Sequence, residues 1–352
     1  MATPNSQPKR NPGYLRIATE EAFAPPEMIA MFRDLLQSPD VDPGFRSLMG
    51  FYIGSQAERP RFVFSRLQDL GELRLADMAA RGIDRQVIGI TAPGPSIFPK
   101  DKAVALATLA NDQLAEACRK HPDKFTGMAA CAPQAPREAA KEIERAVTKL
   151  GMKAVIINSH IQGEYLDNPK FAPVLEAAEA VGVPIYIHPN TPPRNMIGPM
   201  LEAGLDGAIF GFGVETGMHA LRLITSGTLD RFPALKIIIG HMGEALPFWL
   251  YRLDYMHQAG VRAARYDFMK PLKKGTVSSY LRENFYITNS GVAWEPAIKF
   301  TQSVIGADRV LYAMDYPYQC PVEEVVALDA MDMSAEDKKK FFQTNAERAF
   351  KL

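Results

Sequence analysis

Four side chains that can bind a metal ion or move a proton stand directly after short apolar stretches of the sequence. They are Glu20, His188, His241 and Asp315. Imidazole nitrogens and carboxylate oxygens are common ligands of divalent metal ions and common general acids and bases. A single such residue is more often a hydrogen-bonded core residue or a turn cap. A shared site is indicated because the chain has only six histidines, and two of them follow apolar stretches.

Eight apolar stretches rich in β-forming residues predict the strands that would position these side chains. The expected strands are 15–19, 87–91, 126–130, 154–158, 185–188, 236–240, 285–288 and 310–314. Several lack polar alternation, which is typical of strands buried on both faces. Amphipathic segments between them, such as 102–120 and 137–150, predict an outer layer of helices. The alternation predicts an α/β fold of the (β/α)8 TIM barrel type.

A doubly wound open sheet would use the same alternation of strands and helices. The barrel is favoured because eight strands are indicated and because no G-x-G-x-x-G motif follows the first of them. In a barrel, side chains at the carboxyl ends of the strands face the mouth. The four residues would therefore converge there.

The 352 residues show no linker or composition break, so a single domain is expected. Residues 1–13 are polar and proline-rich and are expected to form a flexible N-terminal arm. Residues 25–74 exceed an ordinary connection between strand and helix, which predicts a loop insertion over the barrel mouth.

The balance of charges argues against partners that are attracted by a large net charge on the protein. Lys plus Arg number 40 and Asp plus Glu number 40, so no global charge favours nucleic acid or a membrane surface. No apolar stretch approaches the roughly 18 residues of a membrane span. Three widely spaced cysteines predict neither a disulfide framework nor a zinc finger. A cytoplasmic protein acting on a small molecule is expected.

Several short motifs carry a resemblance to a known family. They are ATEEAF at 18–23, IHP at 187–189, SG at 226–227, DRFP at 230–233, IGHMGE at 239–244, Arg252, and DYP at 315–317. With these motifs the chain resembles the metal-dependent decarboxylases of the amidohydrolase superfamily, the group related to aminocarboxymuconate-semialdehyde decarboxylase. The resemblance implies an amidohydrolase-like barrel and spans most of the chain.

The resemblance implies that Glu20, His188 and Asp315 bind one divalent metal ion and that His241 stands beside it as a catalytic or substrate-orienting group. One departure is Ala22, at the position where related proteins carry a second ligand on the first strand. Another is Asn158, at the position of the lysine that bridges two metals in binuclear relatives. A mononuclear site of two carboxylates and one imidazole favours Mn2+, with Zn2+ as the alternative.

Further residues are candidates to hold the substrate. Arg59 and Arg252 can each offer a carboxylate two parallel hydrogen bonds, although a structural ion pair is the alternative. The resemblance favours a functional Arg252, acting in its own or in a neighbouring subunit. Tyr316 and Tyr318 flank Pro317 beside Asp315 and could contact an aromatic substrate or simply pack; Tyr318 is the one assigned to substrate binding.

Three further residues are expected to position the metal ligands or the catalytic groups without binding the metal or the substrate. Glu215 and His219 are four residues apart and could share one helix face, from which they would position His188 or the metal ligands. Glu244, within the IGHMGE motif, is the third.

The resemblance implies non-oxidative decarboxylation of a phenolic aromatic acid, with 5-carboxyvanillate converted to vanillate and CO2 in lignin-derived aromatic catabolism. An aryl anion is too unstable to form, so the ring carbon must be protonated first, by Asp315 as the favoured donor or by His241. The alternatives are another hydroxybenzoate as substrate, metal-dependent hydrolysis of a small ester, lactone or amide, and a non-catalytic barrel. A homodimer or larger homo-oligomer is expected.

Overall fold

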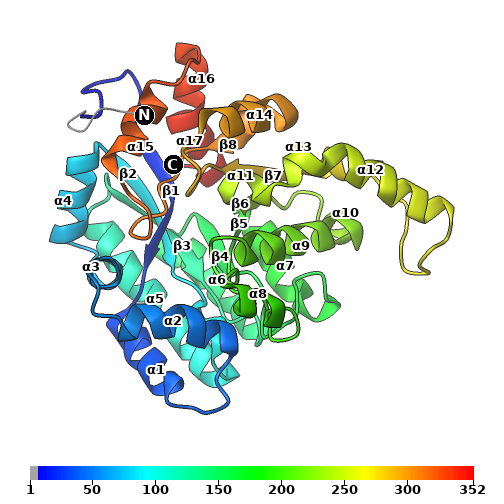
Figure 1. The fold of residues 1–352 in the computed structure, drawn as a ribbon, viewed down its shortest axis with the longest axis horizontal. Coiled ribbons are helices and arrows are strands. Elements are labelled where there is room, and N and C mark those ends of the chain that lie inside the picture. The colour runs from blue at the N-terminus through cyan, green and yellow to red at the C-terminus, as the bar shows by residue number, and fades with distance from the viewer. Residues whose placement is uncertain (1–6) are drawn as a thin grey trace.

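Eight parallel strands, hydrogen-bonded in chain order, form the centre of the fold (Figure 1). The computed structural model describes residues 7–352. The strands are β1 (Ile17–Phe23), β2 (Arg85–Ile90), β3 (Phe125–Ala130), β4 (Ala154–Asn158), β5 (Ile185–His188), β6 (Ile237–Ile239), β7 (Phe285–Thr288) and β8 (Val310–Leu311). The amide of Thr19 donates to the carbonyl oxygen of Tyr312 (3.1 Å), which joins β1 to the segment after β8. The sheet is therefore a barrel.

All eight expected strands are present, and they are buried as their composition predicted. Every residue of β3, β4, β6 and β7 is buried. The first strand differs from its expected range of 15–19, because it begins at Ile17 and continues to Phe23. Glu20 and Glu21 therefore lie inside the strand. Their polarity suggested a strand end, but Glu21 pairs with Ile88 of β2 and is fully buried.

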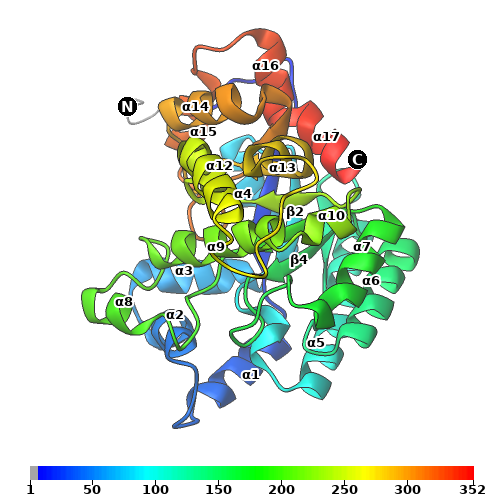
Figure 2. The same cartoon turned by 90° about the vertical axis from the view of Figure 1, so that its right-hand side faces the viewer.

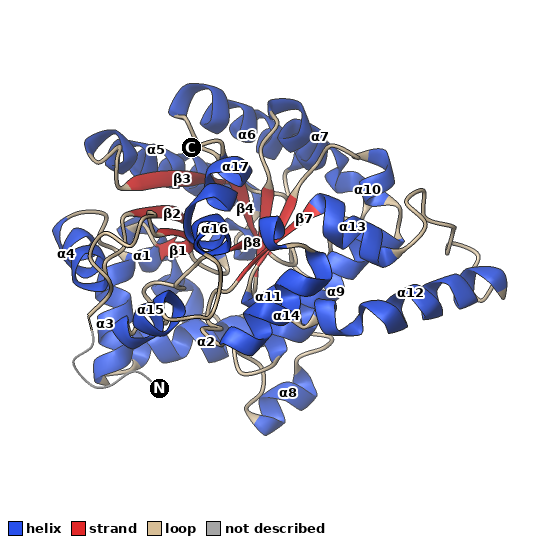
Figure 3. Cartoon of the chain, turned by 90° about the horizontal axis from the view of Figure 1, so that it is seen from above, coloured by secondary structure: helices blue, strands red, loops and turns tan. Residues whose placement is uncertain are grey.

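Helices surround the barrel, with strands in the middle and helices outside (Figure 3). They are α1 (Pro26–Leu36), α2 (Pro43–Gly54), α3 (Glu58–Leu67), α4 (Glu72–Arg81), α5 (Lys100–Lys120), α6 (Pro136–Leu150), α7 (Ala172–Val181), α8 (Gly198–Ala203), α9 (Gly211–Thr225), α10 (Thr228–Arg231), α11 (His241–Glu244), α12 (Leu246–Arg262), α13 (Val277–Asn284), α14 (Glu295–Ile305), α15 (Val322–Asp329), α16 (Ala335–Lys339) and α17 (Asn345–Phe350). Helices α5, α6 and α7 pack side by side on one flank (Figure 2). Within the described residues, none of the helices has the length and apolarity that crossing a bilayer would demand.

The segment 25–74, expected as a loop insertion, is helical: it contains α1, α2, α3 and the start of α4. Two of its aromatic residues, Phe32 and Phe45, are buried, whereas Phe51 is exposed. Phe32 of α1 packs edge-on against Phe45 of α2, with ring centroids 5.0 Å apart. The helices are stable because this apolar face is buried, which the irregular Phe, Arg and Pro content did not reveal.

Helix α12 projects from the body of the molecule (Figure 1). Several of its large apolar side chains face solvent: the exposed fractions are 73% for Phe248, 86% for Tyr251 and 58% for Tyr255. At the other end of the chain, positions 1–6 of the expected N-terminal arm lie outside the described residues. Within the rest of that arm, the amide of Lys9 donates to Asp329 (3.2 Å).

Candidate metal centre

Glu20, His188 and Asp315 come together at the mouth of the barrel. Each offers a ligand atom, and these atoms lie within 4.8 Å of one another. Glu20 comes from β1, His188 ends β5, and Asp315 follows β8. Segments almost three hundred residues apart in the chain therefore meet in one cluster, as the positions at strand ends predicted.

The Glu20 carboxylate is held by one oxygen and leaves the other free. Its Oε2 accepts hydrogen bonds from the hydroxyl of Tyr186 and from Oγ1 of Thr288 (2.9 Å). Its Oε1 is buried and has no hydrogen-bond partner among the described residues. This oxygen lies 3.6 Å from Nε2 of His188 and 3.5 Å from Nε2 of His241. A buried carboxylate oxygen without a partner is unfavourable, so the site fits a bound cation.

His188 has the protonation state of a metal ligand. Its Nδ1 lies 2.8 Å from the carbonyl oxygen of Pro189, which can only accept, so Nδ1 carries the hydrogen. The lone pair is then on Nε2, which faces Glu20. Burial lowers the pKa of His188, which keeps the imidazole neutral. A ring nitrogen fixed in this way by a backbone oxygen is typical of metal-binding histidines.

His241 carries a positive charge beside the three candidate ligands. Its Nδ1 donates to Oε1 of Glu244 (2.8 Å). Burial lowers the pKa of His241, but the carboxylates of Glu244 and Glu20 outweigh burial and raise it to about 10. Burial and the neighbouring Glu20 raise the pKa of the Asp315 carboxyl well above its ordinary value. The site thus combines a cationic imidazole with a carboxyl that resists ionisation.

A left-handed turn orients His241. Five consecutive residues, 241 to 245, have positive φ angles between 50° and 72°, so the segment labelled α11 is not a right-handed helix. A left-handed conformation costs roughly 1–2 kcal/mol for each residue other than glycine. The turn brings Glu244 back to the ring of His241. Asp315 is also left-handed, with φ of 72°. Such strain is characteristic of functional sites that the surrounding structure holds in place.

A cavity of about 120 Å3 opens on these residues. Its lining comes from the barrel and from the helical insertion: Leu48, Tyr52, Arg59, Thr91, Ala92, His188, Ala208, Phe212, His241, Asp315, Tyr318 and Gln319. An adjoining groove of about 660 Å3 shares His241 and Asp315 and extends to Trp249 of α12. A larger cavity of about 700 Å3 contains none of the three candidate ligands, so we do not associate it with the metal site.

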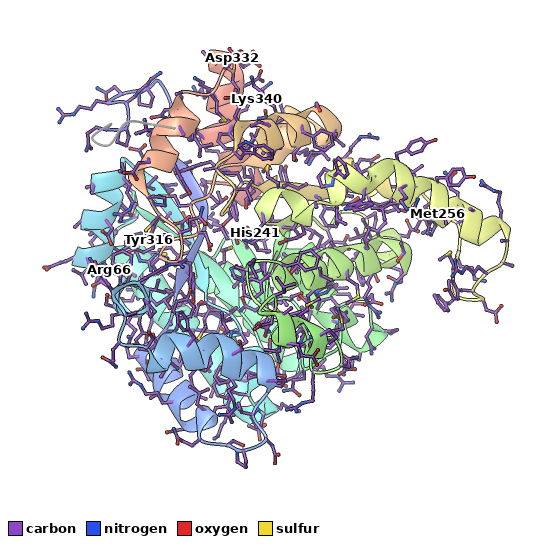
Figure 4. The ribbon with its side chains drawn as sticks, in the orientation of Figure 1. Arg66, His241, Met256, Tyr316, Asp332 and Lys340 are labelled. Carbon is purple, nitrogen blue, oxygen red and sulfur yellow. The ribbon has the colours of Figure 1, made fainter. Side chains whose placement is uncertain are left out.

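Two of the three remaining substrate-binding candidates line this cavity. Arg59 donates through Nη2 to the carbonyl oxygen of Tyr318 (3.1 Å), and the Tyr318 hydroxyl bonds to Oγ1 of Thr91 (2.6 Å). Arg252 is exposed on α12 and lines neither the cavity nor the adjoining groove of its own chain. Figure 4 shows His241 near the centre of the molecule, whereas Met256, which lies on α12 like Arg252, is far from the centre.

Glu215 and His219 are both fully buried on α9. The amide of Leu166 donates to Nε2 of His219 (3.1 Å), so its Nδ1 carries the hydrogen and donates to Oγ of Ser159 (3.2 Å). No hydrogen bond found among the described residues joins either side chain to His188. Burial lowers the pKa of His219 to about 3 and raises the pKa of Glu215 to about 8. The two are neutral core residues, whereas Glu244 contacts the site directly through His241.

Sequence reasoning missed three residues that shape the position of Glu20. Tyr186 and Thr288 supply its hydrogen bonds, and Gly240 leaves room for it. A Cβ atom on Gly240 would lie 2.7 Å from Oε2 of Glu20. A signal for Tyr186 was available, because it is two residues before His188 in the same strand and so shares its face. The other two come from separate strands, whose relation to Glu20 depends on the closed barrel.

The family model described as amidohydrolase matches residues 64–352. The chain belongs to the amidohydrolase family. Among relatives of this family, gamma-resorcylate decarboxylase of Polaromonas sp. is 36% identical over 296 residues, which cover 82% of this chain and 89% of the relative.

Solved structures of the family include two that are similar over nearly the whole chain. One is 5-carboxyvanillate decarboxylase from Novosphingobium aromaticivorans, complexed with manganese and 4-hydroxy-3-methoxy-5-nitrobenzoic acid; it is 60% identical with a TM-score of 0.96 and covers 98% of each chain. The other is 5-carboxyvanillate decarboxylase from Sphingomonas paucimobilis, 37% identical with a TM-score of 0.91, covering 96% of this chain and 99% of the other.

Proposed function

We propose that this amidohydrolase-family protein decarboxylates a phenolic aromatic acid, with 5-carboxyvanillate as the substrate and vanillate and CO2 as the products. The observation that carries the proposal is the cluster of Glu20, His188 and Asp315, with an unpartnered carboxylate oxygen, at a cavity that also holds Arg59. The 60% identity to a manganese-containing 5-carboxyvanillate decarboxylase over nearly the whole chain supports the choice of substrate.

The metal ion in this proposal is Mn2+, held by Glu20, His188 and Asp315. Two carboxylates and one imidazole suit a harder cation than zinc, and the described structural relative contains manganese. When bound, the ion would act as a Lewis acid toward the carboxylate and phenolic oxygen atoms of a substrate.

The residues around the cluster would bind and orient the substrate. The guanidinium of Arg59, exposed at the cavity rim, would bind a substrate carboxylate through two parallel hydrogen bonds. His241, charged at neutral pH, would hold a second anionic oxygen, either the phenolate or the departing carboxylate. Tyr318, whose hydroxyl is already bonded to Thr91, would present its ring to the aromatic substrate.

Asp315 is our proposed proton donor. In the metal-free site, burial and Glu20 raise the pKa of its carboxyl. We propose that Asp315 also carries a proton when the substrate is bound. It gives this proton to the ring carbon that bears the departing carboxylate. The carbon–carbon bond then breaks, its electron pair restores the aromatic ring, and CO2 leaves. Asp315 remains as a carboxylate and must be reprotonated before the next cycle.

We also propose that Arg252 completes the site of a second copy of the chain in a homodimer. Helix α12 exposes Arg252 together with Phe248, Tyr251 and Tyr255, and a clustered apolar surface of this kind is typical of an interface. The groove that leads from His241 reaches the base of the same helix.

Mixing two impaired variants would test the contribution of Arg252, with activity measured at substrate concentrations well below the KM of Arg252→Ala. Subunits with Arg252→Ala would be combined with subunits carrying His188→Ala. If Arg252 acts across the interface, a mixed dimer regains one complete site and activity returns. If activity does not return on mixing, although subunit exchange is demonstrated, Arg252 acts in its own chain or has no role.

The central experiment measures CO2 and ring products from 5-carboxyvanillate and related hydroxybenzoates, using purified protein whose metal content is known. We expect about one divalent ion per chain and equal amounts of CO2 and vanillate. Asp315→Asn should abolish turnover while the protein stays folded. Asp332→Asn is the matched control, because this aspartate is fully exposed and lies at the periphery (Figure 4). Release of an alcohol or amine from esters or amides, without CO2 from any phenolic acid, would overturn the proposal.

The place of the reaction in lignin-derived aromatic catabolism and the cytoplasmic location stay predictions. The chemistry of the proposed product, a methoxylated phenol from which one carboxylate has been removed, is consistent with the first of them.

A further inference from the structure

Glu21 is a fully buried carboxylate next to the proposed ligand Glu20, and nothing above gives it a role. Its exposed fraction is 1%. Its Oε1 accepts from the amide of Met314 (3.0 Å), and its Oε2 accepts from the amide of Tyr316 (3.3 Å). These two amides stand on either side of Asp315. One carboxylate therefore accepts hydrogen bonds from the backbone amides of both residues that flank another proposed metal ligand.

The segment that Glu21 binds has no regular structure to hold it. Strand β8 ends at Leu311, and Asp315 has a left-handed backbone with φ of 72°. A positive φ is uncommon for every residue except glycine, and although aspartate adopts it more readily than most, it is usually stabilised by the surrounding structure. Buried amides also require acceptors. The two oxygen atoms of Glu21 accept hydrogen bonds from these amides and thereby fix the backbone on each side of Asp315.

Other groups fix Glu21 in turn. Nε2 of Gln86 donates to its Oε2 (3.3 Å), and Gln86 accepts from Nη1 of Arg74 (3.1 Å). Arg74 is fully buried and also donates to the carbonyl oxygen of Ala22 (2.6 Å). The amide of Ala22 donates to the carbonyl oxygen of Tyr316 (2.7 Å). Residues 21 and 22 of β1 are thereby bonded to both ends of the segment 314–316.

We propose that Glu21 is a positioning residue for the metal site: its carboxylate clamps the amides of Met314 and Tyr316 and so holds the Asp315 side chain toward Glu20 and His188. Two adjacent residues of β1 then have separate tasks, because Glu20 faces the metal and Glu21 fixes the loop of another ligand. The inference rests on the proposed metal site.

An amide in place of the carboxylate would break the clamp. Gln has one accepting oxygen, and its NH2 group would face an N–H of Met314 or Tyr316, donor against donor. The side chain keeps nearly the same volume, so the barrel should still form. We expect Glu21→Gln to bind Mn2+ 10- to 100-fold more weakly than the unmodified protein, which is the usual effect of losing a group that orients a ligand.

The matched control is Glu142→Gln. Glu142 is also a buried carboxylate with several donors, among them Asn111 (2.6 Å) and Arg145 (2.8 Å), but it lies on α6 in the outer layer of helices. Both variants should lower the melting temperature. Only Glu21→Gln should weaken Mn2+ binding, measured by calorimetry on metal-free protein, and only that variant should lower kcat. If both variants bind Mn2+ as the unmodified protein does, Glu21 is merely structural and the inference is wrong.

Hydrogen exchange of the unmodified protein provides a second test that needs no variant. The amides of Met314 and Tyr316 should be protected in the metal-free protein, although they belong to no strand or helix. Exchange at the rate of exposed, unbonded amides would refute the clamp even if Glu21→Gln failed to fold. Failure of the unmodified protein to bind Mn2+ would instead refute the proposed metal site, so the two failures are distinguishable.

Discussion

Replacing Gly240 by alanine should weaken metal binding without altering any proposed ligand. Gly240 follows β6 with φ of −81° and ψ of −170°, an extended conformation that alanine adopts freely. The added Cβ atom would lie 2.7 Å from Oε2 and 3.1 Å from Oε1 of Glu20. The substitution therefore acts on the Glu20 carboxylate through space and not through the backbone.

The size of the effect follows from how tightly Glu20 is held. Ordinary contact begins near 3.4 Å, so the carboxylate must move by about 0.7 Å (3.4 minus 2.7). It cannot do so freely, because it is 2% exposed and accepts from Tyr186 and Thr288. Losing one hydrogen bond to a charged group costs about 1.5–3 kcal/mol. That range corresponds to roughly 10- to 150-fold weaker Mn2+ binding.

The assay is calorimetric titration of Mn2+ into metal-free protein, with Gly54→Ala as the control. Gly54 ends α2, and an added Cβ there would meet nothing within 4 Å. The control should bind Mn2+ like the unmodified protein. An unchanged Kd in Gly240→Ala would mean that Glu20 moves aside at no cost, and the assignment of its free oxygen as a fixed metal ligand would fail.

Four further predictions concern the hydrogen bonds to Glu20, the pH dependence of stability, Arg252 and the metal. Tyr186→Phe keeps the buried ring but removes a donor to Glu20, so Mn2+ affinity should fall about 10-fold with little change in Tm; equal affinities would contradict the proposed role. Burial raises the folded-state pKa of Glu215 from 4.5 to about 8, so protonation favours the folded state and the free energy of unfolding falls as pH rises through that window. Glu215→Gln should remove this pH dependence. If the melting temperatures of the variant and of the unmodified protein change equally between pH 5 and pH 8, Glu215 is not the titrating group. Arg252→Ala should raise KM and leave kcat nearly unchanged, as steady-state kinetics would reveal, whereas a loss confined to kcat would point to the transition state. Chelation should abolish turnover and added Mn2+ should restore it; activity that persists in demonstrably metal-free protein would exclude a metal-dependent reaction.

The residues that sequence reasoning placed well are those governed by local patterns. His188 and Asp315 follow apolar stretches long enough to be recognised as strands, and parallel strands of a barrel share one mouth. Their convergence could be predicted without coordinates. The end of β1 could not be predicted in this way, because two adjacent glutamates, Glu20 and Glu21, are more typical of a turn than of a buried strand. Their burial depends on partners in β2, β5, β7 and the segment after β8.

The helical insertion and Arg252 show two other limits. Residues 25–74 are irregular in composition, and their helices form because Phe32 and Phe45 find each other in the folded chain. Arg252 was expected at a substrate carboxylate in its own or in a neighbouring subunit, and in its own chain it lies on the projecting α12 and does not line the cavity. Whether it serves a second subunit depends on an assembly that one chain does not contain.

The sequence by itself determined that eight buried strands alternate with helices and that His188, His241 and Asp315 stand at or after strand ends, because burial and periodicity depend on neighbouring residues. Only the tertiary structure decided which oxygen of Glu20 stays free, how a left-handed turn aims His241, and how Glu21 holds the loop of Asp315. These features arise from contacts between segments far apart in the chain, and the strain they contain is tolerated because the closed barrel surrounds them.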